Sequence, residues 1–170
     1  MPRLPFVDTN CADRAAIAER VVAERGSLLD LYRLLLHSPP VASGWLDFLT
    51  AIRTRLLLPP ALRELIIIRI ALLNGAPYEA RQHSPIALQS GATSEQLGAL
   101  GAWRGRPDLF DVATQAALAY TDSVTRDVKA PEPVWQEVRE RFSDRECLEL
   151  TVLIASYNMV SRVLAALELE

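Results

Sequence analysis

The sequence contains one lysine, two cysteines and two histidines in 170 residues, and each scarcity excludes a class of chemistry. Lys129 is the only lysine, which disfavours a Schiff-base mechanism, and arginine carries nearly all the positive charge. Cys11 and Cys147 lie far apart and match no metal-binding or redox spacing, so we expect free cytosolic thiols. The formal net charge of -3, without a basic run, gives no case for nucleic-acid binding.

Long apolar runs are also missing. The N-terminal residues include Asp8, Asp13 and Glu19 and no apolar core, so we expect no signal peptide there. No stretch approaches the roughly 20 apolar residues that span a bilayer, because the most apolar run, Leu65–Ala71, is interrupted by Arg69. We therefore expect a cytoplasmic protein that does not enter the membrane.

What the sequence does have is helical periodicity throughout. Half of the residues are hydrophobic and 23% are charged, which is a globular composition. Apolar residues recur at helical spacing in every segment, and no segment alternates with period two for long. The loops are short, so we predict one all-α domain over residues 1–170.

Capping residues, glycines and prolines divide this domain into helices. Gly101–Pro107 is the most loop-like interior stretch. The expected helices run from a cap at Asp8 or Thr9 to about Arg25, then over Leu28–Leu36, Val41–Leu57, Pro60–Leu73 and Pro77–Ser90, with a short helix from Thr93 or Ser94, one at Asp111–Asp127, one ending near Phe142, and one from Ser143 or Asp144 to Leu167.

Residues 60–90 contain the one group of side chains whose types and spacing indicate a chemical function. The 60–73 helix is apolar on most faces, so we expect it to be central or to face a partner subunit. Glu64 interrupts this apolar surface, and a buried acid is costly unless it is paired. Glu79 and His83 are four residues apart in the next helix, so their side chains share a face. A short turn makes the two helices antiparallel neighbours, and His83 is an available partner for Glu64.

Each of these residues also has a simpler interpretation. Glu79 lies near the start of its helix, where a carboxylate stabilises the positive helix end. His83 can be a core histidine or the partner of Glu79, and Glu64 can be a surface residue near a helix start. The combination of the three is less easily explained in this way.

The order and spacing of several short motifs resemble the carboxymuconolactone decarboxylase / AhpD-like alkylhydroperoxidase superfamily. The resemblance covers most of the chain and is densest at 60–100. The motifs are Tyr32–Arg33 with Leu36–Pro39, Pro60–Leu65, Tyr78–Glu79 with His83, Gly91–Leu97, and Tyr157–Asn158 with Ser161–Arg162.

The chain departs from this family at the cysteines. In the peroxidase branch, a glutamate is followed by two cysteines and then a histidine. Counting back from His83 places these cysteines at Ala76 and Glu79 and the glutamate at Glu64. A thiol peroxidase needs a reactive thiolate, so the substitutions disfavour that mechanism and indicate the cysteine-free, decarboxylase-like branch.

The resemblance implies an AhpD-like helical bundle that forms homo-oligomers, commonly trimers or hexamers, with no metal or organic cofactor. We hypothesise that His83 is a general acid/base and that Glu79 and Glu64 orient it or exchange protons with it. The substrate would be a small unsaturated acid or carbonyl compound that is decarboxylated, isomerised, dehydrated or cyclised. Candidate substrate-binding residues are Tyr78, Tyr32 and Trp45, for which core packing is an equal alternative.

Three other functions stay open at this point. Glu64, Glu79 and His83 could bind a divalent metal ion, although one histidine makes this a weak signal. The chain could also be a non-catalytic oligomeric binding protein on the same fold, or a residual peroxidase. Arg63, Arg69 and Arg81 are close enough in sequence to bind a substrate carboxylate, and each could equally be a surface cation.

Overall fold

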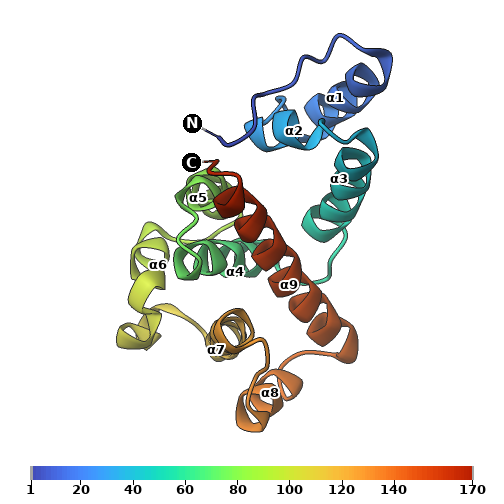
Figure 1. The fold of residues 1–170 in the computed structure, drawn as a ribbon. Helices are drawn as coiled ribbons and strands as arrows, with labels where there is room; N and C mark the ends of the chain where they lie inside the picture. Colours follow the sequence, from blue (N-terminus) through green and yellow to red (C-terminus); the bar gives the residue numbers. More distant parts are fainter. Residues whose placement is uncertain (1, 170) are drawn as a thin grey trace. The chain divides into compact units, whose positions relative to one another are not determined.

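A computed structural model describes residues 2–169, and within that range every regular element is a helix (Figure 1). The predicted all-α fold is therefore confirmed. Contacts divide the chain into two compact units, one formed by residues 2–56 with 166–169 and the other by residues 57–165.

The first unit contains α1 (Ala12–Arg25), α2 (Asp30–Leu35) and α3 (Pro39–Thr54), with α1 and α2 both packed on α3. Several predicted boundaries in this unit were wrong, including the end of the third helix, which lies at Thr54 and not near Leu57. Asp8 does not cap α1, because its carboxylate accepts hydrogen bonds from Asn10 and Cys11 stands at the N-cap. The third helix starts two residues earlier than predicted, because Pro39 fits the first helical position.

The second unit contains α4 (Pro60–Leu73), α5 (Pro77–Gln89), α6 (Ser94–Ala99), α7 (Val112–Asp127), α8 (Glu132–Arg139) and most of α9 (Asp144–Ala166). Nine of the 14 residues of α4 are buried, and α4 packs against α5 and α7. The predicted central position of this helix is confirmed. One core cluster of this unit comprises Leu65, Ile68, Ala87, Ala92, Leu100, Trp103, Phe110 and Leu118.

The turn chemistry of this unit largely follows the predictions. Gly75 ends α4 with a φ of 62°, in the left-handed region that glycine tolerates. Thr93 forms a capping box with Gln96 at the start of α6. The loop predicted at Gly101–Pro107 was wrong, since the chain there forms the 3₁₀ helices η1 (Leu100–Gly105) and η2 (Pro107–Leu109).

Helix α9 has 23 residues, about the length predicted for it, but it is more apolar than the predicted absence of a membrane-length apolar stretch allowed. By length and composition alone it could cross a membrane, but 61% of its apolar window is buried within the protein. The core helix of a soluble protein passes the same test. Its side chains reach several helices of the unit: Asn158 bonds Asn74 and Thr125, and Glu149 accepts the backbone N–H of Leu57 at 2.6 Å.

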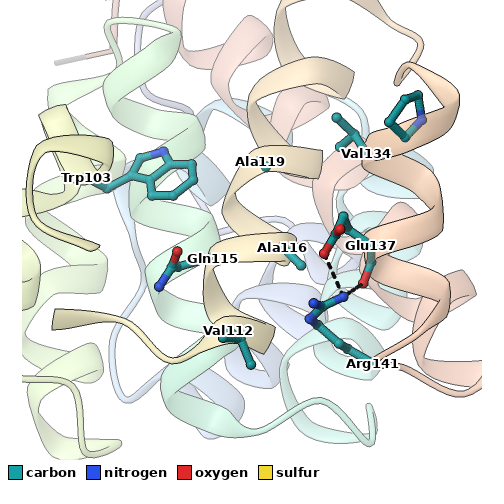
Figure 2. A pocket seen from close by; sticks show the side chains of 9 residues that line it. Trp103, Val112, Gln115, Ala116, Ala119, Val134, Glu137 and Arg141 are labelled. Atoms are coloured by element: carbon teal, nitrogen blue, oxygen red, sulfur yellow. Dashed lines mark hydrogen bonds and ion pairs between the residues drawn. The ribbon is translucent and has the colours of Figure 1, made fainter. Parts of the chain in front are cut away.

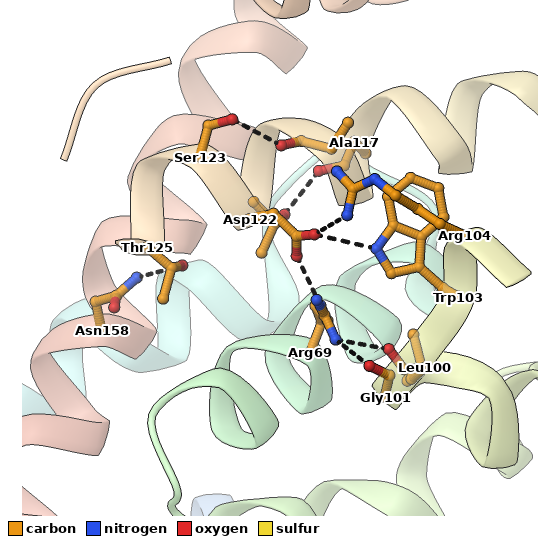
Figure 3. Close-up of polar contacts among 12 residues, drawn as sticks. Arg69, Leu100, Gly101, Trp103, Arg104, Ala117, Asp122, Ser123, Thr125 and Asn158 are labelled. Atoms are coloured by element: carbon orange, nitrogen blue, oxygen red, sulfur yellow. Dashed lines mark hydrogen bonds and ion pairs between the residues drawn. The ribbon is translucent and has the colours of Figure 1, made fainter. Parts of the chain in front are cut away.

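A buried ionic cluster joins α4, α7 and η1 (Figure 3). The Arg69 Nε donates to Asp122 at 2.6 Å, and its Nη1 donates to the carbonyls of Leu100 and Gly101. The second carboxylate oxygen of Asp122 accepts from Arg104. Burial raises the pKa of the Asp122 carboxyl, but the hydrogen bonds from the two arginines outweigh this effect and lower the pKa overall.

Replacing Asp122 with asparagine is expected to destabilise the fold by about 3–5 kcal/mol, because it leaves the buried Arg69 guanidinium without its counter-charge. Because the folded-state pKa of Asp122 is lowered, the stabilisation is present above the unfolded pKa of about 3.9 and is lost as the pH falls through the folded value. Urea denaturation at several pH values measures both effects.

Asp108→Asn is the matched control, since Asp108 pairs with Arg106 on the surface, where both side chains are more than half exposed. Its effect on stability should be much smaller than that of Asp122→Asn, because an exposed ion pair is screened by solvent. Equal losses of stability in the two variants, or a loss in Asp122→Asn that persists unchanged at low pH, would contradict a buried ion pair at Asp122.

Candidate active site

Helices α4 and α5, which are joined by a short turn and pack against each other, place the candidate site residues. Pro77 occupies the first position of α5, so Glu79 lies in the first turn, where the helix dipole favours a carboxylate. His83 follows one turn later on the same face. Glu64 lies in the N-terminal half of α4, and the two helices pack closely enough for its side chain to reach His83.

The structure brings Glu64, Glu79 and His83 into direct contact. His83 Nδ1 lies 2.6 Å from Glu64 Oε2, and His83 Nε2 lies 3.1 Å from Glu79 Oε1. All three side chains are buried, with residue exposures of 4% for His83 and 6% for each glutamate. The imidazole therefore has a carboxylate at each of its two nitrogens.

This geometry limits where protons reside. An ionised carboxylate only accepts hydrogen bonds, so with Glu64 ionised His83 Nδ1 carries the hydrogen of the shorter contact. The contact to Glu79 can be made in two ways: an imidazolium donates to a carboxylate, or a carboxylic acid donates to a neutral imidazole. The contact between His83 and Glu79 is therefore compatible with a proton on either partner.

The electrostatic environment favours the charged form of His83. Burial lowers the pKa of the imidazole, and this is the largest single effect. The hydrogen bonds and charges of Glu64 and Glu79 act in the opposite direction and together raise the pKa above its ordinary value of 6.5. A histidine with such a pKa, bound to a second ionisable group, is suited to general acid–base chemistry.

Tyr157 is a member of this cluster that the sequence analysis did not assign to the site. Its ring, from α9, meets the His83 ring edge-on, with centroids 5.2 Å apart and planes at 87°. The only signal in the sequence was its place in a motif shared with the family. The ring of Tyr157 therefore packs against the imidazole in addition to the two carboxylates that contact its nitrogens.

The predicted substrate-binding residues are divided between the two units. Tyr78 is buried beside Glu79 in α5. Tyr32 and Trp45 belong to the first unit, in α2 and α3. Tyr32 is 2% exposed, and burial raises the pKa of its phenol. Their contact with a substrate stays a prediction.

Neither thiol stands at a position that the resemblance gives to a family cysteine. Cys11 is exposed in the first unit. Cys147 is buried in α9, where its thiol donates to the carbonyl of Phe142 and burial raises its pKa. It lies ten residues from Tyr157, which is about 15 Å along the helix. The resemblance places the family cysteines at Ala76 and Glu79.

Metal binding finds no support in the side-chain arrangement. Within residues 2–169, no group of three or more His, Cys, Asp and Glu side chains is arranged to hold a metal ion. Both nitrogens of His83 face carboxylate oxygens at hydrogen-bonding distance.

A hollow of about 380 Å³ lies elsewhere in the second unit, between η1, α7 and α8 (Figure 2). Its walls are largely apolar, with the ion pair of Arg141 and Glu137 at one side. The lining does not include Glu64, Glu79 or His83. It consists of Trp103, Val112, Gln115, Ala116, Ala119, Pro133, Val134, Glu137 and Arg141.

Comparison with known proteins supports the family and the fold. Among solved structures, a peroxidase-related protein from Silicibacter sp. TM1040 superposes with a TM-score of 0.85 at 17% identity, over 99% of this chain and 91% of that one. A cysteine-to-alanine variant of the debrominase Bmp8, in complex with 2,3,4-tribromopyrrole, gives a TM-score of 0.82 at 18% identity, over 98% and 89% of the two chains.

Sequence comparison shows the relationship to this family as well as the shared fold. The uncharacterized protein YdfG of Bacillus subtilis (strain 168) is 27% identical over 107 residues, which is 62% of this chain and 72% of that protein. The sequence pattern of the carboxymuconolactone decarboxylase family matches residues 39–123, half of the chain, and this segment includes Glu64, Glu79 and His83. The chain therefore belongs to the carboxymuconolactone decarboxylase family.

Proposed function

We propose that this protein is a cofactor-independent acid–base enzyme of the lyase or isomerase type, acting on a small unsaturated acid or carbonyl compound. The proposal rests on one observation: a buried histidine has a carboxylate at each ring nitrogen, at 2.6 Å and 3.1 Å. Ionisable groups with shifted pKa values concentrate at functional sites.

The three residues have distinct roles in this proposal. Glu64 accepts the Nδ1–H of His83 and so fixes the tautomer and the plane of the ring. His83 Nε2 and Glu79 exchange the shared proton, and Glu79 passes it to or from the substrate. In a decarboxylation, the substrate loses CO₂ and leaves an enolate, which takes the proton; water then returns a proton to the pair.

Glu79 is the residue that separates this reaction from thiol chemistry. It stands where the resemblance to the peroxidase branch places the second cysteine. A carboxylate transfers protons and cannot form a disulfide or a sulfenic acid, so the substitution favours proton transfer over peroxide reduction.

A non-catalytic role on the same fold is less well supported by the contacts. Replacing a buried ion pair with packed apolar residues is often neutral or stabilising, so stability does not require two acids around a buried histidine. The tribromopyrrole bound by the debrominase relative is a small planar ring. We propose a substrate of similar size for this chain.

The first test is His83→Gln in a turnover screen of small unsaturated acids, lactones and halogenated pyrroles. We expect the variant to lose about 10²–10⁴-fold in kcat, because it cannot accept or donate the shared proton. His37→Gln is the matched control, since His37 is the other histidine, is exposed and bonds the carbonyl of Pro5. A correctly folded His83→Gln protein with the turnover of the parent would refute the proposal.

A second test measures the protonation of His83 directly by NMR, in His37→Gln protein so that one histidine is observed. The parent midpoint should lie above 6.5, and Glu64→Gln or Glu79→Gln should each lower it, because a raising contribution is removed. With both glutamates replaced, burial acts alone and the midpoint should fall below 6.5.

The raised pKa of His83 also determines the direction in which the stability of the protein changes with pH. The histidine's contribution to stability should be fully present below pH 6.5 and be lost as the pH rises through the folded-state value. A midpoint that does not respond to either glutamate would show that the carboxylates do not control this histidine.

A third test addresses residual peroxidase activity. The double variant Cys11→Ser/Cys147→Ala should keep the turnover found in the screen, because neither thiol stands at a position that the resemblance gives to a family cysteine. Alkylation of the parent thiols should likewise leave turnover unchanged. Peroxide consumption that disappears on alkylation or in the double variant would instead favour thiol chemistry.

A further inference from the structure

The hollow between η1, α7 and α8 is a cavity that the proposed function does not use (Figure 2). Its volume of about 380 Å³ falls within the range of about 300–1,000 Å³ that is typical of small-molecule sites. Every residue of its lining belongs to the second unit, and Glu64, Glu79 and His83 are not among them. The hollow is therefore a candidate for a second binding site, separate from the proton-transfer cluster.

The hollow lies where α7 and α8 face each other with small side chains on the α7 side. The lining residues of α7 are spaced three or four apart, so they form one face of that helix. Two of them, Ala116 and Ala119, carry a single methyl group each, which leaves the space opposite them open. Val112 on the same face is 67% exposed although it is apolar, and Val134 of α8 adds to the apolar wall. The hollow thus presents apolar surface that a ligand can cover.

Trp103 forms an aromatic wall that is held in place from several sides. The residue is 5% exposed, and its Nε1 donates to Asp122 at 3.3 Å. The guanidinium carbon of Arg104 lies 4.3 Å from the centroid of the ring. A side chain that is already fixed loses little conformational freedom when a ligand packs against it. Aromatic rings also gain from offset or edge-on contacts with one another, so this wall favours a flat aromatic ligand.

Gln115 supplies a fixed hydrogen-bond acceptor. Its Nε2 donates to the carbonyls of Pro107 and Phe110 at 3.1 Å and 2.8 Å. Because both partners are acceptors, the amide nitrogen must face them and the amide oxygen must face away. That oxygen, Oε1, accepts no hydrogen bond from residues 2–169, and Figure 2 shows it on the side of the amide that is directed toward Trp103. A ligand with an N–H or O–H group can donate to it.

The charged side chains of the hollow neutralise each other. Arg141 Nη1 lies 2.7 Å from the carboxylate of Glu137 and 3.4 Å from that of Glu140. Two acids beside one arginine leave no excess of positive charge for an anionic ligand. A cationic ligand among apolar walls needs a counter-charge, and the Glu137 carboxylate already has one. The charges of the hollow therefore favour an uncharged ligand.

We propose that this hollow binds an uncharged, flat aromatic molecule of one or two fused rings that carries an N–H or O–H group. The ring packs against Trp103 and the methyl groups of Ala116 and Ala119, and the N–H or O–H donates to Gln115 Oε1. The inference does not depend on the proposed function, because the two sites share no residue.

Indole and benzofuran test the proposal, since the two molecules have nearly the same size and shape and differ in the N–H. Binding to the full chain is measured by NMR titration, through the side-chain N–H resonances of Trp103 and Gln115. Indole should shift both resonances and bind about two- to ten-fold more tightly than benzofuran, because it makes one additional hydrogen bond. Indole-3-carboxylate should bind more weakly than indole, because its charge finds no free counter-charge.

Two variants locate the site. Ala119→Leu fills the hollow and should weaken indole binding at least about ten-fold, because the ring can no longer be buried there. Ala113→Leu is the matched control, since it makes the same change on α7 at a partly exposed position outside the lining, and its effect should stay below about two-fold. Gln115→Met keeps the size of the side chain and removes the acceptor, so indole and benzofuran should bind to it equally.

The outcomes separate this inference from the proposed function. His83→Gln should bind indole as the parent does, whatever its turnover. The inference is overturned if indole shifts neither Trp103 nor Gln115, if indole and benzofuran bind the parent equally, or if indole-3-carboxylate binds more tightly than indole. Equal losses in Ala119→Leu and Ala113→Leu overturn it as well. Shifts of the same resonances when the protein alone is concentrated would assign the hollow to a second copy of the chain and also overturn it.

Discussion

Helix α4 must bury an apolar surface on most of its sides while it carries two charged side chains into the same interior. Each charge is therefore acceptable only with a partner from another helix. Glu64 finds His83 on α5, and Arg69 finds Asp122 on α7. The two contacts fix α4 against two neighbours at once, so the central helix of the unit positions both the candidate site and the ionic cluster.

These two buried contacts differ in whether their proton can occupy more than one position. Asp122 is surrounded by donors from Arg69, Arg104 and Trp103, and an acid with a lowered pKa and fixed donors stays ionised. In the other contact, the proton between His83 and Glu79 has two acceptable positions. The first arrangement is suited to holding helices together, and the second is suited to moving a proton.

Local signals predicted much of the fold, and they failed where long-range contacts decide. The capping box at Thr93 and the left-handed Gly75 follow from nearby residues alone. The approach of Glu64 to His83 followed from helical spacing and one short turn. The partnership of Arg69 with Asp122, 53 residues away, left no local trace, and Arg69 was consequently counted among possible substrate anchors. Tyr157 was missed as a site residue for the same reason.

The comparisons show the family and the fold, while the chemistry at Glu64, His83 and Glu79 is our proposal, and Glu79 is the residue on which that proposal depends. With a cysteine there, a neighbouring histidine would serve to generate a thiolate, and the reaction would move electrons. With Glu79 there, the same histidine faces an acid whose only reactive property is a proton. The pair of helices that holds Glu64 against His83 is thus compatible with either reaction, and in our proposal Glu79 is the side chain that favours proton transfer.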